Sequence, residues 1–475
     1  MNTNFSKIFI NNQWVKAPKT QDILSPYDSK LVGTVGIANK AQMTEAIVVA
    51  NRAFEEMKHL PIFKIVDGLK KMQQYIQENF EEIAHDLSEE AGKPISVAKA
   101  EVNRALHTFE DGIEEAKRMY GETFTLDRRP WGENKEAKVE RFPIGVIAAI
   151  TPFNFPLNLV AHKVVPALAS KNTVVVRPAT QTPFCALHLA AAYAQSGLPK
   201  GGLNVLPSDY EAADLLSTDS KIKMVSFTGS VSVGWSIKKK AADKKVALEL
   251  GGNAAVIIHD DVPNLEKAAA AIALAGFSNA GQSCISAQRI YVQEKNYKKF
   301  LELLKEKVEG LVVGDPRDEK TQVSSLINSK EADRVMEWII EAKKQGARVL
   351  TGGVREGNVI MPTVLTETTS KMKVNCMEIF GPLVTVIPYK EFDEALTEVN
   401  NSEFGLQAGI FTQNINLVHK AYQTLDVGGL IINDVPTYRI DHMPYGGIKN
   451  SGVGREGVRY AMQEMTEPKL LVISY

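Results

Sequence analysis

The sequence predicts an α/β protein with two large domains, each built on a β-sheet covered by α-helices. The chain has 475 residues, whereas a single hydrophobic core stops growing at roughly 250 to 300 residues. From Gly145 to Leu248, short apolar runs of β-forming residues alternate with helical runs, which is typical of a parallel sheet with helices on both faces. A second alternation of this kind runs from Ala254 to about Ile432. It predicts the second domain.

The first 120 residues combine strand signals with long amphipathic stretches, in which apolar residues recur at spacings of three and four. The expected strands are Ile8 to Ile10 and Leu31 to Val35, and the expected helical segments are Asn39 to His59, Ile62 to Glu90 and Ile95 to Tyr120. Gly121 is a typical C-terminal stop for the last of these helices. We therefore expect helices that cover a sheet.

The segment from Gly121 to Arg141 is charged and contains Pro130 and Trp131, so we expect a protruding hairpin with a turn near Gly132 to Asn134. The expected strands that follow are Gly145 to Ile150, Thr173 to Val176, Leu203 to Leu206, Met224 to Phe227 and Val246 to Leu248. Ligands of such sheets bind at the carboxyl ends of the strands.

In the second half we expect helices from Asn296 to Glu309 and from Glu331 to Gln345, with strands near Arg289 to Val292 and Val384 to Pro388. The final run, Lys469 to Ser474, is a β-type segment. An unpaired apolar edge favours aggregation, so we expect this strand to be paired, and another subunit is one candidate partner.

The bulk composition excludes several function classes. Lys and Arg total 55 and Asp and Glu total 56, a formal net charge of -1, so no overall field attracts the chain to nucleic acid or to anionic lipid. Residues 1–14 lack the order of regions that marks a signal peptide. Apolar runs such as Ala268 to Gly276 reach about ten residues, half of the roughly 20 that a membrane helix needs. We expect a cytoplasmic protein without a membrane or nucleic-acid partner.

The cysteines Cys185, Cys284 and Cys376 are odd in number and form no CxxC or His-x-x-Cys pattern, so neither a disulfide framework nor a metal site is expected. A single thiol is most often a small buried apolar group, and Cys185 and Cys376 fit that role. Cys284 follows small and polar residues, which favours an approachable thiol. A helix N-terminus formed by Ile285 to Gln288 would lower its pKa.

Two loops offer partners for such a nucleophile. Glu249 follows an apolar strand and precedes two glycines; a strand-end ion pair is the commoner role for such a glutamate, but a catalytic base also fits this position. Asn154 lies in a loop that Pro152 and Pro156 make rigid. Its amide can donate a hydrogen bond to an oxyanion, although a structural loop role explains the same residues.

Residues 227–234, FTGSVSVG, lie at the end of a predicted strand and lead into a predicted helix. A helix N-terminus there favours a phosphate. A plain strand-to-helix turn explains this pattern equally well, because it is neither GxGxxG nor a Walker loop.

Taken in order, several motifs resemble the NAD(P)-dependent aldehyde dehydrogenase superfamily over nearly the whole chain. They are TPFNFP at 151–156, FTGS at 227–230, ELGGN at 249–253, GQSC at 281–284, EIFGP at 378–382 and PYGGIKNSGVGREG at 444–457. The resemblance implies a Rossmann-type cofactor-binding domain (1–120 and 141–251), an α/β catalytic domain (252–445) and a small β oligomerisation element (121–140 and 446–475). It also implies a homodimer or homotetramer.

The resemblance also implies the chemistry. Cys284 attacks an aldehyde, the Asn154 side chain and the Cys284 backbone amide hold the oxyanion, hydride passes to the nicotinamide, and Glu249 activates the water that releases the acid. The cofactor contacts implied are Thr151, Pro152, Phe153, Arg177, Ala179, Thr180, Phe227, Thr228, Gly229, Ser230, Leu250, Gly251, Glu378 and Phe380. Because Glu249 is present, the resemblance favours hydrolysis over acyl transfer to coenzyme A.

Two departures from the family pattern concern the cofactor. Arg177 stands where the family usually has lysine, and Thr180 stands where NAD-preferring members often have glutamate. Threonine removes a repulsion of the 2′-phosphate, and arginine can pair with it. We therefore predict NADP or NAD as cofactor, with a preference for NADP.

The segment from Asn433 to His442 resembles branches that oxidise small anionic or hydroxylated aldehydes, such as lactaldehyde, glyceraldehyde 3-phosphate, phosphonoacetaldehyde and sulfolactaldehyde. The predicted substrate contacts are Arg104, His162, Ser283, Tyr438 and Arg439. Several anion-specific relatives carry arginine at the position of Ser283. The alternatives are a succinate-semialdehyde or broad-range enzyme, a coenzyme A-acylating relative, and an inactive structural protein on this fold.

Overall fold

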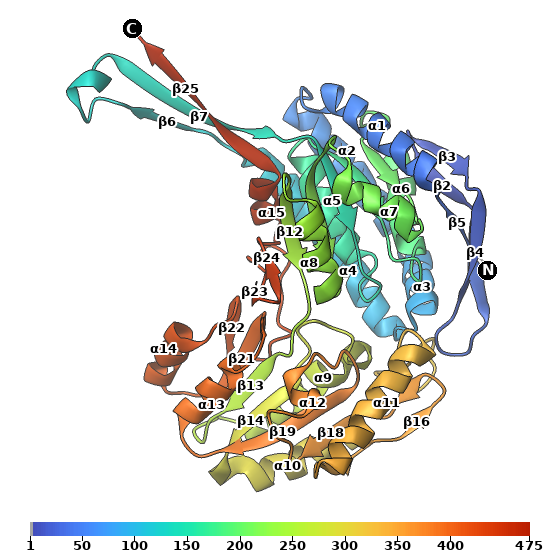
Figure 1. Ribbon diagram of the computed structural model, residues 1–475, viewed down its shortest axis with the longest axis vertical. Helices are drawn as coiled ribbons and strands as arrows, with labels where there is room; N and C mark the ends of the chain where they lie inside the picture. The colour runs from blue at the N-terminus through green and yellow to red at the C-terminus, as the bar shows by residue number, and fades with distance from the viewer. Residues whose placement is uncertain (1–2) are drawn as a thin grey trace.

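The computed structural model describes residues 3–475 and consists of two lobes with a projecting arm. Each lobe is built around one sheet, and the arm extends from the upper lobe in Figure 1. This arrangement confirms the predicted α/β fold with two sheets and a small β element. Within the described residues, no helix combines the length and apolar character that crossing a bilayer requires.

The first sheet has the strand order β24-β12-β11-β8-β9-β10-β2-β3. Its strands are β2 (Lys7–Ile10), β3 (Gln13–Lys16), β8 (Val146–Ile150), β9 (Thr173–Arg177), β10 (Leu203–Val205), β11 (Ile222–Thr228), β12 (Lys245–Glu249) and β24 (Gly452–Val453). The strands from β12 to β10 pair in parallel, as predicted, and β2 and β24 flank them in antiparallel pairing.

Helices cover both faces of this sheet. They are α1 (Lys40–Met57), α2 (Ile62–Glu78), α3 (Phe80–Ala91), α4 (Ile95–Lys117), α5 (Asn158–Ala169), α6 (Phe184–Ala194), α7 (Tyr210–Thr218), α8 (Val231–Lys240) and α15 (Val458–Glu464). Along β8, Ile147 packs into the core cluster on one face, and Val146 and Ala148 pack into the cluster on the other. A sheet buried on both faces needs such continuous apolar strands.

The continuous helical pattern predicted from Ile62 to Glu90 is two helices in the structure. Asn79 separates α2 from α3 with φ -107° and ψ 22°, and its side chain donates a hydrogen bond to the Tyr75 carbonyl oxygen at 2.7 Å. Asparagine competes for backbone groups in this way, which ends a helix. Apolar periodicity alone does not reveal the break, because the apolar stripe continues on both sides of Asn79.

The second sheet has the order β15-β18-β19-β14-β13-β21-β22. Its strands are β13 (Ala255–Ile258), β14 (Arg289–Gln293), β15 (Arg348–Thr351), β18 (Thr363–Thr366), β19 (Leu383–Tyr389), β21 (Gln407–Phe411) and β22 (Gly429–Ile432). Its helices are α9 (Leu265–Phe277), α10 (Glu294–Glu309), α11 (Ser329–Lys344), α12 (Lys373–Cys376), α13 (Phe392–Asn400) and α14 (Ile415–Thr424). All pairs in this sheet are parallel except β15 with β18.

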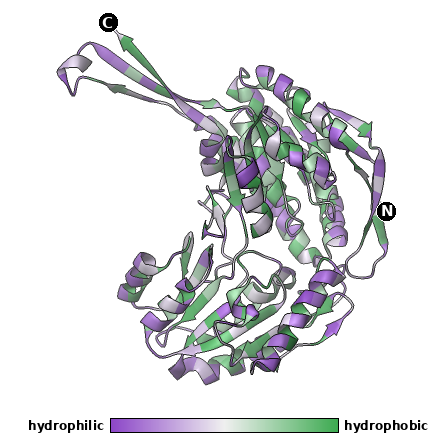
Figure 2. Ribbon diagram, viewed as in Figure 1, coloured by the Kyte–Doolittle hydropathy of each residue, from purple (hydrophilic) through white to green (hydrophobic). Residues whose placement is uncertain are grey.

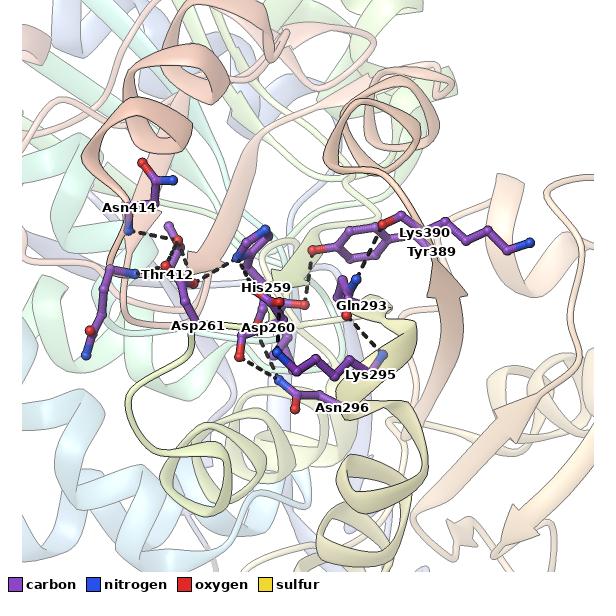
Figure 3. A network of polar contacts seen from close by, with 12 residues as sticks. His259, Asp260, Asp261, Gln293, Lys295, Asn296, Tyr389, Lys390, Thr412 and Asn414 are labelled. Carbon is purple, nitrogen blue, oxygen red and sulfur yellow. Dashed lines mark hydrogen bonds and ion pairs between the residues drawn. The ribbon is translucent and has the colours of Figure 1, made fainter.

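A polar network closes the end of β13 that lies away from Gly252 (Figure 3). The Asp261 carboxylate accepts hydrogen bonds from the Thr412 hydroxyl at 2.8 Å and from the Gln413 amide at 3.1 Å. The Tyr389 hydroxyl donates to the Ile258 carbonyl at 3.2 Å. Because these contacts join the ends of β13, β19 and β21, we assign the network a structural role.

The arm consists of β6 (Glu122–Thr125), β7 (Lys135–Pro143) and β25 (Thr466–Ser474), with a 3-10 turn at Pro130–Gly132. The terminal strand pairs along its whole length with β7 of its own chain, so the predicted strand pairing is satisfied without another subunit. Figure 2 shows the apolar character of β25 on this arm, where Leu470 and Leu471 are exposed. The prediction assigned all of residues 446–475 to the oligomerisation element. Within that range, β24 and α15 belong to the first lobe instead, because β24 pairs with β12 and because Val458 and Met462 of α15 lie in the core of that lobe.

Smaller sheets complete the fold. They are the three-stranded sheet β1 (Thr3–Phe5), β5 (Leu31–Ile37) and β4 (Lys19–Leu24), the pair β16 (Arg355–Glu356) and β17 (Val359–Ile360), and the pair β20 (Phe404–Gly405) and β23 (Ile448–Lys449).

Candidate active site

A cavity of ≈ 830 Å³ opens at the carboxyl ends of β8, β9, β11 and β12. Thr151 follows β8, and Arg177, Thr228 and Glu249 end the other three strands. Parallel strands bring their carboxyl ends to one edge of a sheet, so the loops after these strands meet in one place. Residues of the second lobe close the cavity from the other side.

Most of the predicted site residues line this cavity. They are Arg104, Thr151, Pro152, Phe153, Asn154, Arg177, Ala179, Phe227, Thr228, Gly229, Ser230, Glu249, Leu250, Gly251, Ser283, Cys284, Glu378, Phe380 and Arg439. Thr180, His162 and Tyr438 are not among the lining residues.

Cys284 lies in a turn that follows three residues of left-handed backbone. Asn279 and Ala280 have φ of 52° and 53°, a region that non-glycine residues rarely adopt and that is associated with functional sites. The predicted helix at 285–288 is wrong, because this segment is the end of a turn followed by residues without regular secondary structure, up to the start of β14 at Arg289. No helix terminus therefore acts on the thiol. Burial raises the pKa of Cys284 to about 12, against the effect of a hydrogen bond with Tyr445.

Glu249 faces the cavity from the end of β12 and is 4 % exposed. Neither carboxylate oxygen has a hydrogen-bond partner among the described residues. Burial raises the pKa of Glu249 well above its usual range, and the negative charge of Glu456 acts in the same direction. An unpaired buried carboxyl that faces a cavity is available to take a proton from a bound molecule.

Glu249 and Cys284 come together because Gly252 allows their loops to touch. A Cβ atom at Gly252 would lie 2.4 Å from the Cys284 carbonyl oxygen. The Gly252 amide also donates a hydrogen bond to Glu378 Oε1 at 2.9 Å. A side chain at this position would push the loop of the thiol away from the end of β12.

Asn154 follows β8 and is 5 % exposed. Its Nδ2 donates to the Gln282 carbonyl oxygen at 3.0 Å, which places the amide beside the loop of Cys284. Its Oδ1 is buried without a hydrogen-bond partner among the described residues. An amide fixed beside the thiol can serve as an oxyanion donor.

A buried ion pair clamps the loop that carries Asn154. Lys93, which lies just before α4, forms an ion pair with Glu101 of α4, and both side chains are fully buried. Lys93 Nζ donates to the Asn154 carbonyl oxygen at 2.6 Å. Glu101 Oε1 accepts from the backbone amides of Leu157 and Asn158 at 3.0 and 3.1 Å. One ion pair thus holds the loop on both sides of Phe155.

Two arginines reach the cavity, and each has a carboxylate partner. Arg104 Nη2 lies 2.7 Å from Asp441 Oδ1, and the Arg104 side chain is 32 % exposed. Arg439 Nη2 lies 3.0 Å from Glu456 Oε2, and its side chain is 8 % exposed. Arg439 Nε is buried without a hydrogen-bond partner among the described residues. Arg104 is therefore the more accessible of the two cations.

His162 is fully buried in α5, with Nε2 2.7 Å from Asp441 Oδ1. Burial lowers the pKa of His162, and the positive charge of Arg439 acts in the same direction. The predicted substrate contact of His162 is therefore replaced by a contact with Asp441, the partner of Arg104. Tyr438 is 44 % exposed and lies outside the cavity lining.

The cofactor end of the cavity suits a dinucleotide. Ser230 precedes the first turn of α8, and its side chain makes no capping hydrogen bond. The backbone amides of that turn are therefore available to a phosphate. Arg177 also lines this end; its Nη2 donates to the Ser208 carbonyl oxygen at 3.3 Å, while Nε is buried without a partner among the described residues. Burial raises the pKa of Glu378 to about 7, against the effect of the Gly252 amide.

Three buried residues at or beside the cavity, Tyr445, Glu456 and Lys163, were missed by sequence reasoning. Tyr445 hydroxyl lies 3.0 Å from Cys284 Sγ, and Lys163 Nζ lies 2.8 Å from Glu456 Oε1. Burial opposes ionisation of Glu456, but the charges of Lys163 and Arg439 bring the pKa of Glu456 down to about 2. Tyr445 and Glu456 both lie in the quoted motif at 444–457, which is the signal that could have drawn attention to them.

A thiol, an unpaired carboxyl and a fixed amide face one cavity, at the edge of a parallel sheet where dinucleotides bind. Together they define a site suited to covalent chemistry on a carbonyl group. The chain belongs to the aldehyde dehydrogenase family, which it matches over residues 14–471. It is thus an oxidoreductase that uses NAD(P).

Individual relatives are similar over nearly the full length. The chain is 44% identical over 468 residues to a 3-sulfolactaldehyde dehydrogenase of Priestia aryabhattai, with 98% of each protein covered. Among solved structures, aldehyde dehydrogenase 21 of Physcomitrella patens in complex with its reaction product succinate has a TM-score of 0.98 and 39% identity, over 100% of this chain and 99% of that one. The NADP-dependent glyceraldehyde-3-phosphate dehydrogenase of Bacillus halodurans, complexed with NADP, has a TM-score of 0.96 and 34% identity, with 99% of each chain covered.

Proposed function

We propose that this enzyme oxidises a small anionic or hydroxylated aldehyde to its carboxylic acid, with Cys284 as nucleophile and Glu249 as the base for hydrolysis. This proposal rests on the observation that Cys284, Glu249 and Asn154 line the same cavity as Arg104 and Arg439. The experiment is an aldehyde panel run with both cofactors, in which the acid product is identified. Formation of an acyl-coenzyme A product in place of the free acid would contradict the proposal.

In the proposed reaction the Cys284 sulfur bonds to the aldehyde carbon, and the carbonyl electron pair moves to oxygen, where the Asn154 amide donates a hydrogen bond. The cavity end lined by Arg177, Ser230 and Glu378 would hold NAD(P), which would supply hydride acceptance. When the oxyanion re-forms the carbonyl group and the carbon–hydrogen bond breaks, the acyl group remains bonded to the Cys284 sulfur as a thioester. Glu249 then takes a proton from water as the water oxygen attacks the thioester carbon. The carbon–sulfur bond breaks, and its electron pair returns to Cys284.

The cations at the substrate end support an anionic substrate. Arg104 and Arg439 line the cavity, and their partners Asp441 and Glu456 hold them in place. The relatives named above act on sulfolactaldehyde and glyceraldehyde 3-phosphate, and one releases succinate, so each of their products or substrates carries an anionic group. A substrate that leaves succinate, such as succinate semialdehyde, is the second candidate, favoured by the similarity to the Physcomitrella enzyme.

Replacing Arg104 with alanine should raise KM for an anionic aldehyde about tenfold or more, because an arginine that binds an anion contributes a charge-assisted hydrogen bond. KM for a neutral aldehyde such as propanal should change less than about twofold, because no charged contact is lost. Steady-state kinetics with both aldehydes measure this ratio. Arg118→Ala, an exposed arginine just beyond the same helix, is the control; equal effects on the two aldehydes would contradict the anion pocket.

We also propose that NADP is the preferred cofactor, because the Arg177 guanidinium reaches the cavity with an unpartnered Nε. Thr180 lies outside the cavity lining, so Arg177 carries this proposal.

The variant Arg177→Ala should lower kcat/KM for NADP about tenfold to a hundredfold, because a charge-assisted contact with the 2′-phosphate is lost. The value for NAD should change little, since NAD lacks that phosphate. Initial rates with each cofactor give the ratio. An unchanged ratio, or a strong NAD preference of the unsubstituted enzyme, would contradict the proposal.

We propose further that the arm joins copies of this chain into a dimer or a tetramer. The support is a set of exposed apolar side chains on both faces of β25, where Leu470, Val472 and Ile473 are between 42% and 58% exposed. Phe142 on the neighbouring strand β7 and Phe124 on β6 are exposed as well. Exposed apolar strands at an open sheet edge suit pairing with another copy. Sedimentation velocity of the full chain measures the assembly, and a monomer at micromolar concentration would contradict the proposal.

The location that we propose is the cytoplasm. Cys185, Cys284 and Cys376 are all free thiols, which suits a reducing compartment. Cell fractionation tests this.

A further inference from the structure

Cys284 needs a group that stabilises its thiolate, because the thiolate is the nucleophile. No helix begins at this residue, and burial disfavours the charged form. The ionisable groups that act on the sulfur are Tyr445, through a hydrogen bond, and Glu378, Arg439 and Glu249, through their charges. The two carboxyl groups disfavour a negative sulfur, whereas Tyr445 and Arg439 favour it. Of the last two, Tyr445 makes the direct contact, with its hydroxyl 3.0 Å from Sγ.

The Tyr445 hydroxyl is held in that position by contacts on several sides. The residue is 3 % exposed, and its backbone pairs with Glu456 through hydrogen bonds of 3.1 and 2.7 Å. The Arg439 guanidinium carbon lies 3.7 Å from the centre of the tyrosine ring. The next residue, Gly446, packs against Glu249, since a Cβ atom there would lie 2.9 Å from Glu249 Oε1.

We propose that Tyr445 is a catalytic residue whose hydroxyl donates a hydrogen bond to the Cys284 sulfur whenever that sulfur carries negative charge. This inference rests on the proposed function, in which Cys284 is the nucleophile. Between a neutral thiol and a hydroxyl either group can be the donor, but a thiolate can only accept. Hydrogen bonds to a charged acceptor are roughly twice as strong as neutral ones, so the contact stabilises the thiolate more than the thiol.

The same contact acts twice in the reaction. It favours the thiolate before attack on the aldehyde carbon. It acts again during hydrolysis, when the carbon–sulfur bond breaks and the electron pair returns to sulfur. Arg439 supports both steps, because its positive charge lies against the tyrosine ring and favours negative charge on both the phenol and the thiol.

The test is the pH dependence of alkylation of Cys284 by iodoacetamide, with the modified residue identified by mass spectrometry. In Tyr445→Phe the midpoint of the profile should move to higher pH, and the alkylation rate below the midpoint should fall about tenfold to a hundredfold. kcat should fall by a similar factor with little change in KM for the aldehyde. Tyr422→Phe, at an exposed tyrosine of α14, is the control, and its alkylation profile and kcat should match those of the unsubstituted enzyme. The thermal unfolding midpoint of Tyr445→Phe should also equal that of the unsubstituted enzyme.

An unchanged alkylation profile in Tyr445→Phe would overturn the inference. If that variant does not fold, 3-fluorotyrosine at position 445 provides the second measurement: its phenol is a stronger donor, so the midpoint should move to lower pH, and a midpoint that does not move would overturn the inference. Failure of the proposed function is separate, because it would show as aldehyde oxidation retained by Cys284→Ala, whatever the alkylation profile of the tyrosine variants.

Discussion

Replacing Glu249 with glutamine is expected to make the enzyme accumulate as the thioester during its first turnover and to leave only slow turnover afterwards. The amide cannot take a proton from water, but it leaves the attack by Cys284 and the formation of the thioester intact. Mixing this variant with aldehyde and NADP should release about one NADPH per active site in a rapid burst. Steady-state turnover should then be slower by about 10² to 10⁴, the usual contribution of a general base. Rapid-mixing absorbance measures both phases, and mass spectrometry of the protein detects the trapped acyl group.

The pH dependence of the unsubstituted enzyme provides the matched comparison. Burial first, and the charge of Glu456 second, raise the pKa of Glu249, so its carboxyl stays protonated over a wider pH range than an exposed glutamate. A protonated carboxyl is not a base, so kcat should rise with pH as Glu249 loses its proton. This rising limb should be absent from the residual turnover of Glu249→Gln. Loss of the burst together with the steady state would contradict the assignment.

Replacing Lys93 with methionine is the second change for which we expect a large effect. It leaves Glu101 as a buried charge without its ion-pair partner, which costs about 3 to 5 kcal/mol in the free energy of unfolding. The Asn154 carbonyl oxygen also loses its 2.6 Å contact. A small displacement of a catalytic group costs about 10²-fold in rate, so kcat should fall by up to that factor. Denaturant unfolding and steady-state kinetics measure the two effects.

The double variant Lys93→Met with Glu101→Leu separates stability from activity. Apolar replacement of both partners of a buried ion pair is often nearly neutral, so much of the unfolding free energy should return. kcat should stay low, because Asn154 and the amides at 157 and 158 still lack their anchors. Lys117→Met, in an exposed pair of α4, should cost no more than about 1 kcal/mol. Recovery of kcat along with stability would contradict the positioning role.

The site residues that were predicted from the sequence are those next to a recognisable local pattern, such as the end of an apolar strand or a run of small polar residues. Glu249 follows an apolar strand, so alternation and the strand end were sufficient to predict its place near the cavity. Arg177 was predicted from the family resemblance, and it ends β9 at the same edge of the sheet. Cys284 was found from its small polar neighbours. Its supposed helix was not found in the structure, because the left-handed residues before it redirect the chain into a turn, and apolar periodicity carries no information about that backbone.

The remaining contacts join segments that are far apart in the chain. Tyr445 meets Cys284 across 161 positions, and Lys93 meets the Asn154 carbonyl across 61. A buried polar contact of this kind leaves no periodic trace at either residue. The motifs that contain Tyr445, Cys284 and Asn154 mark each segment separately but do not show which side chains meet. His162 shows the reverse case: its type suggested an anion contact, and burial behind Asp441 gave it another partner.

The order in which its strands are synthesised determines when the arm can form. β7 is made early, but its neighbour β25 emerges from the ribosome after every other strand of residues 3–475. The two strands pair over nine registered positions, from Thr466 with Pro143 to Ser474 with Lys135. Until then β7 has only the short strand β6 beside it. The cavity is also completed late in synthesis, because Tyr445 and Glu456 come late in the chain. A nascent or prematurely terminated chain therefore presents an incomplete arm and an incomplete cavity together, so that one truncation removes the last strand of the arm and residues of the cavity.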